Sequence, residues 1–190
     1  GSNGGDGKVA ARVLEEAGRE VVVVDAKPED EEKDLGDPDV LVDALFGTGF
    51  EGEPRLGAAR LIEQMNGLGA PILAVDLPSG VDASTGEVAG AAVDADLTVT
   101  FHGAKVGHYV TPGAYLAGYL EVVDIGLVAF ETQHARVTRE ILDRVPRRSP
   151  EGNKYKSGHV VVVGGSPGMT GAPCLSASAA FRADAGYVML

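Results

Sequence analysis

Three turns in the sequence carry the residues with the clearest capacity for chemistry. They span residues 2–7, 43–49 and 76–82, and each follows an apolar, strand-like run or opens a helical one. In an open parallel sheet the turns after the strands fall on one edge, where ligands bind. We therefore expect these three turns to contribute to one site.

Each of these turns contains an oxygen-bearing side chain. Asp43 and Asp76 come near the ends of otherwise apolar runs, where a carboxylate is costly unless it is paired, hydrogen-bonded or bound to a cation. Asn3, Asp43 and Ser79 offer one oxygen from each turn, and hard monovalent or divalent cations take such ligands. The sequence contains no Cys/His cluster, so a zinc site is not expected.

The opening turn, SNGGDG, runs directly into a helical stretch. Its glycines allow close approach of the backbone, and the helix would direct its N–H groups and its dipole toward an anion. A plain turn that caps a helix fits the same residues. The turn lacks the G-x-G-x-x-G spacing of dinucleotide-binding folds, but Asp25 ends the next apolar run and could contact a ribose. An ordinary NAD-dependent oxidoreductase therefore stays open at this point.

A glycine-rich loop further along holds Lys105 between His102 and His108. A single histidine near a sheet edge is more often structural than catalytic, so neither histidine is assigned a role. The turn at Ser79 is not a nucleophile elbow, because DLPSG lacks the first glycine of G-x-S-x-G.

Short β-branched runs alternate with helical stretches, which predicts an α/β fold with a mostly parallel sheet covered on both faces. The helix over 55–68 should bury Leu56, Ala59, Ile62 and Met65, which recur at the helical spacing. The other expected elements are a helix over 7–17 and strands over 20–26, from 40, from 71, over 97–101 and over 119–124.

The character of the chain changes after residue 126. A short helix is expected over 138–145, and a Pro/Gly-rich stretch follows it. From residue 159 the order of strand, glycine loop and helix is repeated, and YVML begins a further strand. We therefore expect a first domain over 1–127, a linker with a short helix over 128–158, and the start of a second domain over 159–190.

The net charge, the length of the apolar runs and the cysteine count limit the partners and the cell compartment that we expect for this chain. The net charge of −12 argues against a nucleic-acid or anionic-membrane surface, because phosphate contacts need clustered Lys and Arg. No apolar run is long enough to span a membrane, and no signal peptide is evident. The single cysteine, Cys174, excludes an intramolecular disulfide and fits a reducing cytoplasm. A small-molecule substrate is expected, and a homo-oligomer remains open.

Four motifs, NGGDG, VDALFGTGF, AVDLPSGVDASTG and DLTVTFHGAKVG, closely resemble the NAD(P)H-hydrate epimerase family, the YjeF N-terminal domain. The stretch HVVVVGGSPGMTGAPCLSASAAFRADAG resembles the opening of the ADP- or ATP-dependent NAD(P)H-hydrate dehydratase domain. The first resemblance covers about 1–127 and the second about 136–190. Together they imply a fragment of a bifunctional enzyme: a three-layer Rossmann-like domain lacking its first strand, then the start of a ribokinase-like α/β domain.

The resemblance implies an isomerase that repairs nicotinamide nucleotides, with part of a lyase. The epimerase interconverts the R and S forms of NAD(P)H hydrated at C6, and the dehydratase removes water from the S form with ADP or ATP. The second domain is only begun, so dehydratase activity and good nucleotide binding are not expected of this chain. The alternatives are an NAD-dependent Rossmann oxidoreductase and a non-catalytic dinucleotide-binding or interaction module.

The resemblance also implies a role for individual residues. A potassium ion would be contacted by Asn3, Asp43 and Ser79. Asp76 is the candidate acid/base group, by inference, because a carboxylate at a strand end facing the ring could move protons, and a purely binding Asp76 stays open. Lys105 could balance nearby carboxylates or reach a phosphate. Ser2 stands where the family usually has asparagine, so a hydroxyl replaces one amide there. The residues implied to contact the hydrated dinucleotide are Ser2, Asn3, Gly4, Gly5, Asp6, Gly47, Thr48, Gly49, Phe50, Glu51, Gly52, Glu53 and Asp76.

Overall fold

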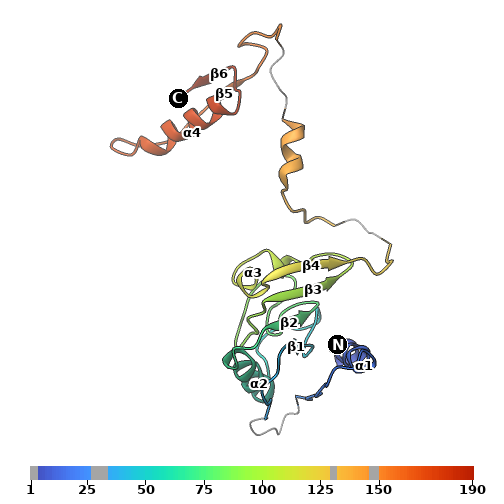
Figure 1. The fold of residues 1–190 in the computed structure, drawn as a ribbon. Coiled ribbons are helices and arrows are strands. Elements are labelled where there is room, and N and C mark those ends of the chain that lie inside the picture. Colours follow the sequence, from blue (N-terminus) through green and yellow to red (C-terminus); the bar gives the residue numbers. More distant parts are fainter. Residues whose placement is uncertain (1–3, 27–33, 129–131, 146–149) are drawn as a thin grey trace. The chain divides into compact units, whose positions relative to one another are not determined.

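A computed structural model describes residues 4–26, 34–128, 132–145 and 150–190. The chain forms two compact units, Gly1–His134 and Ala135–Leu190, and each is described by itself (Figure 1). The first unit contains the sheet whose edge carries Asp43 and Asp76.

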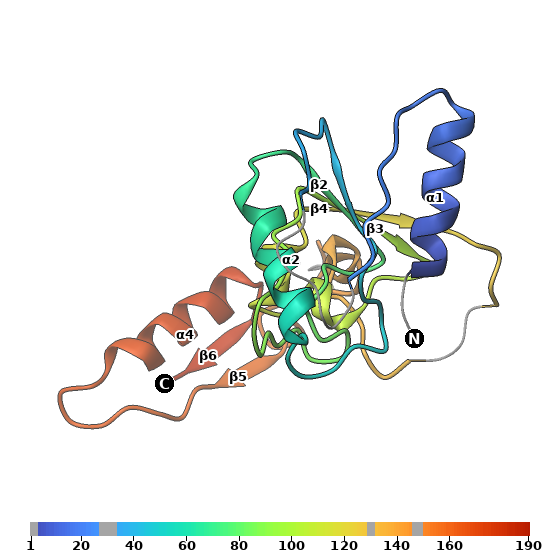
Figure 2. The same cartoon turned by 90° about the horizontal axis from the view of Figure 1, so that it is seen from below.

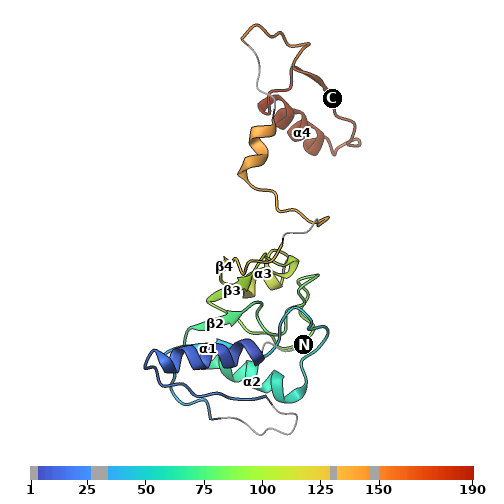
Figure 3. The same ribbon diagram turned by 90° about the vertical axis from the view of Figure 1, so that its right-hand side faces the viewer.

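The sheet of the first unit has four strands, all parallel, in the order β1-β2-β3-β4. The strands are β1 (Leu41–Asp43), β2 (Ile72–Val75), β3 (Leu97–Phe101) and β4 (Tyr119–Val123). Figure 3 shows β4, β3 and β2 following one another in this order. The predicted α/β class with a mostly parallel sheet is confirmed, and parallel pairing places the carboxyl ends of all four strands at one edge.

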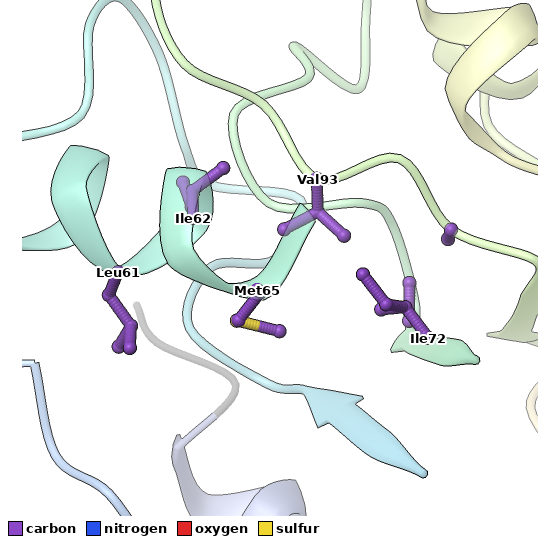
Figure 4. Packing of buried hydrophobic residues seen from close by; sticks show 7 residues of the cluster. Leu61, Ile62, Met65, Ile72 and Val93 are labelled. Atoms are coloured by element: carbon purple, nitrogen blue, oxygen red, sulfur yellow. The ribbon is translucent and has the colours of Figure 1, made fainter. Parts of the chain in front are cut away.

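Helix α2 (Leu56–Gly67) supplies much of the hydrophobic core. Its buried positions are Ala58, Leu61, Ile62 and Met65, a spacing that places them on one face. Figure 4 shows side chains of α2 together with Ile72 at the start of β2 and Val93 in the segment before β3. The expectation for Leu56 is wrong: it is the first residue of the helix, ahead of the buried stripe, and is 66% exposed.

Helix α1 (Gly4–Glu16) begins three residues earlier than the expected start at Gly7. None of its residues is buried, and Val9 and Val13 lie exposed on it. Figure 1 shows α1 and α2 on different sides of β1, and the two helices also lie apart in Figure 2.

The predicted strand over 20–26 does not form in this structure. Val22 is 77% exposed, and of this run Val24 packs against the core as a partly buried residue. A strand forms only where its backbone hydrogen-bonds to a neighbouring strand. Among the described residues β1 pairs with β2 alone, so the run over 20–26 has no such partner. An apolar β-branched run therefore does not suffice to predict a strand here.

The second unit contains η2 (Arg139–Arg144), β5 (His159–Val161), α4 (Gly171–Arg182) and β6 (Tyr187–Met189). Strands β5 and β6 pair in parallel, as expected for a strand, glycine loop, helix and strand in succession. The short helix expected over 138–145 is present as the 3₁₀ helix η2. None of the helices in the described ranges has the length and apolar character needed to cross a membrane.

Candidate active site at the carboxyl edge of the sheet

Asp43, the last residue of β1, is joined to the turn that follows β2. The Ser79 hydroxyl donates to Oδ1 of Asp43 at 2.6 Å, and the Ser79 N–H donates to Oδ2 at 2.7 Å. The N–H of Leu45 also donates to Oδ1, at 3.2 Å. The Ser79 hydroxyl in turn accepts a bond from the Phe46 N–H at 2.9 Å. These bonds join the predicted turns at 43–49 and 76–82.

The Asp43 carboxylate is buried among neutral donors. Its exposure is 1%, and across the described residues no Lys, Arg or His forms an ion pair with it. Burial therefore raises the pKa of Asp43 above its ordinary value, while the bonds from Ser79 and Leu45 act in the opposite direction. The group is a buried carboxylate that lacks a compensating positive charge in this part of the chain.

Glycine is required next to Ser79. Gly80 has φ of +99°, and a Cβ atom there would lie 2.3 Å from the carbonyl oxygen of Ala91. The Ser79 carbonyl accepts a bond from the Val93 N–H at 2.9 Å. The turn is thus fixed on both sides, which holds the Ser79 hydroxyl toward Asp43.

Asp76, one residue beyond β2, has a cation beside it. Lys105 Nζ donates to Oδ1 of Asp76 at 2.5 Å, and the Thr100 hydroxyl donates to the same oxygen at 2.9 Å. Lys105 also donates to the Thr100 hydroxyl at 2.7 Å and to the Phe101 carbonyl at 3.1 Å. Asp76 is 7% exposed, so this ion pair lies largely out of water.

His108 connects the backbones of these two residues. The Lys105 N–H donates to Nδ1 of His108 at 2.9 Å, so the ring proton is on Nε2, which donates to the Asp76 carbonyl at 2.9 Å. The ring is 4% exposed. Burial lowers the pKa of His108, the positive charge of Lys105 acts in the same direction, and the bond to the Asp76 carbonyl opposes it. His108 is therefore neutral at neutral pH.

The structure brings together some of the sequence-predicted residues. Ser2 and Asn3 lie outside the described residues, while Gly4, Gly5 and Asp6 form the first turn of α1. A Cβ atom at Gly7 would lie 2.8 Å from that of Ala44, so the start of α1 lies against the turn after β1.

The remaining predicted contacts lie in the turn over 47–53. The rings of Phe46 and Phe50 stack there with centroids 4.5 Å apart, and the Phe50 N–H donates to the Gly47 carbonyl at 3.0 Å. Thr48, Gly49, Glu51, Gly52 and Glu53 are exposed beside this pair.

The resemblance gave Lys105 the role of balancing nearby carboxylates or reaching a phosphate, and the structure pairs it with Asp76. Sequence reasoning did not assign a role to Thr100 or His108. One signal was available for Thr100: like Thr98, it is a polar residue in a buried strand. Thr98 donates instead to the Ala117 carbonyl at 2.7 Å, so the two threonines have different partners. For His102 the structure records a bond from its backbone N–H to the Val123 carbonyl, not a contact with Asp76.

The side chains at Asp43 offer oxygen ligands, which suit a hard cation. Within the described ranges no group of three or more His, Cys, Asp or Glu side chains is placed to hold a metal ion. The carboxylate and hydroxyl oxygens of Asp43 and Ser79 are of the type that such a cation takes. A carboxylate has about four acceptor positions, of which the bonds above use three. The recorded bonds therefore leave one acceptor position of Asp43 unused.

Residues 25–107 match the family described as the YjeF-related protein N-terminus. Over these residues the chain is similar to a YjeF-related N-terminal domain. The matched region includes Asp43, Asp76, Ser79 and Lys105, whereas α1 lies before it and His108 directly after it.

Curated relatives extend the similarity over nearly the whole length of the chain. A bifunctional NAD(P)H-hydrate repair enzyme of Moorella thermoacetica is 42% identical over 99% of this chain and 42% of its own length. Its namesake from Salinibacter ruber is 37% identical over 99% of this chain and 43% of its own length. The enzyme of the same name from Escherichia coli is 36% identical over 99% of this chain and 42% of its own length. The chain thus spans less than half the length of these relatives, and none of the three is named an oxidoreductase.

Proposed function

We propose that the first unit epimerises the R and S forms of hydrated NAD(P)H at C6, as a step in nicotinamide nucleotide repair. The observation that carries the proposal is the largely buried Asp76–Lys105 pair at the carboxyl edge of the sheet. It lies within a YjeF-related domain whose curated relatives are named for NAD(P)H-hydrate repair.

The proposed chemistry uses this pair to move one proton. The C6 hydroxyl takes up a proton and leaves as water, while the lone pair of the ring nitrogen N1 stabilises the cation at C6. Water then adds to the opposite face of C6 and gives up a proton, so that atoms and charge balance. Asp76 is the proposed acid/base group, and Lys105, 2.5 Å from Asp76 Oδ1, is the neighbouring proton donor.

The proposed dinucleotide contacts are those expected from the resemblance. Ser2, Asn3 and the residues Gly4–Asp6 would face the phosphates, and residues 47–53 would contact the rest of the substrate. The N–H groups and dipole at the start of α1 support the first assignment, because a helix N-terminus favours an anion. The contact of Gly7 with Ala44 supports it further, since that contact holds the start of α1 beside the turn after β1.

Potassium is the proposed cation, bound by Asp43 and Ser79 together with Asn3. The support is the oxygen donor set and the buried, uncompensated carboxylate of Asp43. When bound, the ion would supply positive charge beside Asp43 and the substrate phosphates. The residues of this chain supply the geometry: Ser79 fixes both oxygens of Asp43.

For the chain as a whole we propose the limits given by the sequence: a first domain over 1–127, a linker over 128–158 and the start of a second domain over 159–190. The last segment would open an ADP- or ATP-dependent dehydratase domain. Its support is the similarity to enzymes named bifunctional, which extends through both units of the chain.

The test is epimerisation of the purified R form of hydrated NADH by the chain in potassium buffer, followed by chromatography. Asp76→Asn is the informative variant, because asparagine tolerates the left-handed backbone of Asp76, whose φ is +71°. Loss of an acid/base group predicts a rate lower by about 100-fold or more. His134→Gln, at an exposed position, is the matched control. Equal rates for Asp76→Asn and the unaltered chain would refute the assignment.

A further inference from the structure

His108 joins the same two residues that the proposed reaction uses. Its Nδ1 accepts from the backbone of Lys105, and its Nε2 donates to the backbone of Asp76. The side chains of Lys105 and Asp76 meet directly at 2.5 Å. The two residues are therefore connected twice, once through their side chains and once through the imidazole ring.

We infer that His108 is a positioning residue of the proposed epimerase: its neutral imidazole fixes the backbones of Asp76 and Lys105 so that their side chains meet. The inference rests on the proposed function. His108 itself touches neither Oδ1 of Asp76 nor Nζ of Lys105 in any recorded bond, so its effect on the reaction would be exerted through these two residues.

Asp76 needs such support because of its backbone. Its φ of +71° is in the left-handed region, which residues other than glycine rarely adopt unless the surroundings hold them there. The Asp76 N–H is held by the Val99 carbonyl at 2.7 Å, and its carbonyl by the His108 ring at 2.9 Å. The Asp76 carbonyl is buried, and the His108 ring is its one recorded donor among the described residues. Without this bond the carbonyl would be left unsatisfied.

Lys105 depends on the same ring. It lies 29 positions from Asp76 in the sequence and comes from the loop after β3. That loop is fixed next to His108, where the Gly107 N–H donates to the Ala83 carbonyl at 2.9 Å. A Cβ atom at Gly107 would lie 2.5 Å from the Asp82 carbonyl oxygen, so the close approach of the loop requires glycine. His108 thus connects a firmly seated loop to the Lys105 backbone.

Only the neutral ring with its proton on Nε2 can make both bonds. A proton on Nδ1 would place two N–H groups against each other at the Lys105 backbone. The charged groups acting on the ring are Lys105, which disfavours protonation, and Asp76, which favours it. Burial is the largest cause that lowers the pKa of His108, and the charge of Lys105 adds to it, in agreement with a ring that is neutral in the folded chain.

A buried histidine with a purely structural role would affect stability and not turnover. Two variants separate these roles, because each retains a different half of the connection. His108→Gln places an amide near Nε2 and can still donate to Asp76, whereas His108→Asn places one near Nδ1 and can still accept from Lys105. His134→Gln is again the exposed control.

The experiment measures epimerisation by the full chain, kcat separately from KM, with thermal unfolding of each variant. We expect kcat to fall by about 10- to 100-fold in both His108 variants, with KM changed less than threefold, because a small misplacement of reacting groups lowers the rate by such factors. A kcat within twofold of the unaltered chain in both variants would overturn the inference. An unaltered chain that does not epimerise would overturn the proposed function instead.

A measurement on the unaltered chain keeps the inference testable if the variants do not fold. ¹⁵N NMR of the His108 ring distinguishes the two neutral forms and the charged form. We expect the neutral form protonated on Nε2 at pH 7. A ring protonated on Nδ1, or charged, would overturn the inference whether or not the chain epimerises.

Discussion

Two strand ends of the same sheet hold their carboxylates in opposite ways. At the end of β1, Asp43 accepts bonds from neutral donors, the Ser79 hydroxyl and backbone N–H groups. Just beyond β2, Asp76 accepts a bond from the ammonium group of Lys105. Both side chains are nearly inaccessible to solvent. The difference between the two aspartates is therefore one of charge compensation and not of burial.

This contrast indicates a division of labour. A buried carboxylate among neutral donors has an unfavourable charge, which a cation would relieve. A carboxylate beside an ammonium group is already compensated, and has a proton donor within hydrogen-bonding distance. Two titratable groups in such different environments are suited to different roles. Substitutions at each strand end test whether Asp43 and Asp76 differ in this way.

Lys105→Met should have the largest effect. It leaves the Asp76 carboxylate buried without its cation, and breaking a buried pair from one side costs about 3–5 kcal/mol. The Lys105 side chain is 21% exposed, so solvent screening sets the expected loss at the lower end of that range, about 3 kcal/mol. Urea unfolding measures it, and the epimerisation rate should fall about 100-fold in parallel.

The double variant Asp76→Asn/Lys105→Met is the control for this prediction. Its neutral amide no longer needs a cation, so the double variant should lose less stability than the two single variants added together. Strictly additive losses would show that Asp76 and Lys105 do not stabilise each other, and the contrast with Asp43 would fail.

Ser79→Ala tests the other strand end. It removes the buried donor to Asp43 and the acceptor of the part-buried Phe46 N–H. Leaving one such group unsatisfied costs about 1–3 kcal/mol. Ser84→Ala, in an exposed position of the same stretch, should change the free energy of unfolding by less than about 0.5 kcal/mol. Equal effects of the two substitutions would remove the structural role given to Ser79.

The sequence predicts the sheet, and the meeting of the turns that carry Asp43 and Ser79, better than it predicts the partners of Asp76. The turns after β1 and β2 must meet because their strands pair in parallel, and Asp43 is in register with Ala74. Lys105 lies in the loop after β3, and the conformation of that loop brings it to Asp76. Hydrophobic periodicity predicts helices and strands but not the conformation of a loop. The run over 20–26 fails for a related reason, since a strand depends on a neighbour that its own residues do not specify.

Potassium should stabilise the unaltered chain through Asp43. At ten times its dissociation constant, an ion that binds the folded state alone adds about 1.4 kcal/mol. The check compares unfolding in potassium chloride and in choline chloride at one ionic strength. Asp43→Asn, which removes the charge, should abolish the difference between the two salts. An unaltered chain that unfolds alike in both salts would contradict the proposed ion site.

The smallest and most discriminating effect is the pH dependence of this potassium increment. Because the folded-state pKa of Asp43 lies above the ordinary 3.8, the folded chain binds more protons than the unfolded chain between the two values. The stability contributed by that proton is fully present below pH 3.8, the ordinary pKa, and is lost as the pH rises through the folded-state pKa of Asp43. Potassium competes with the proton, so its increment should be small near pH 4 and largest above the folded-state pKa.

His108 has the opposite shift and provides the internal comparison. Its folded-state pKa lies below the ordinary 6.5, so the unfolded chain takes up the proton first and stability falls as the pH drops below 6.5. That loss is the same in both salts and cancels in the difference between them. What remains reports on Asp43 alone, and Asp43→Asn should leave no difference at any pH. A potassium increment that stays constant between about pH 4 and about pH 8 would show that the ion does not bind the Asp43 carboxylate.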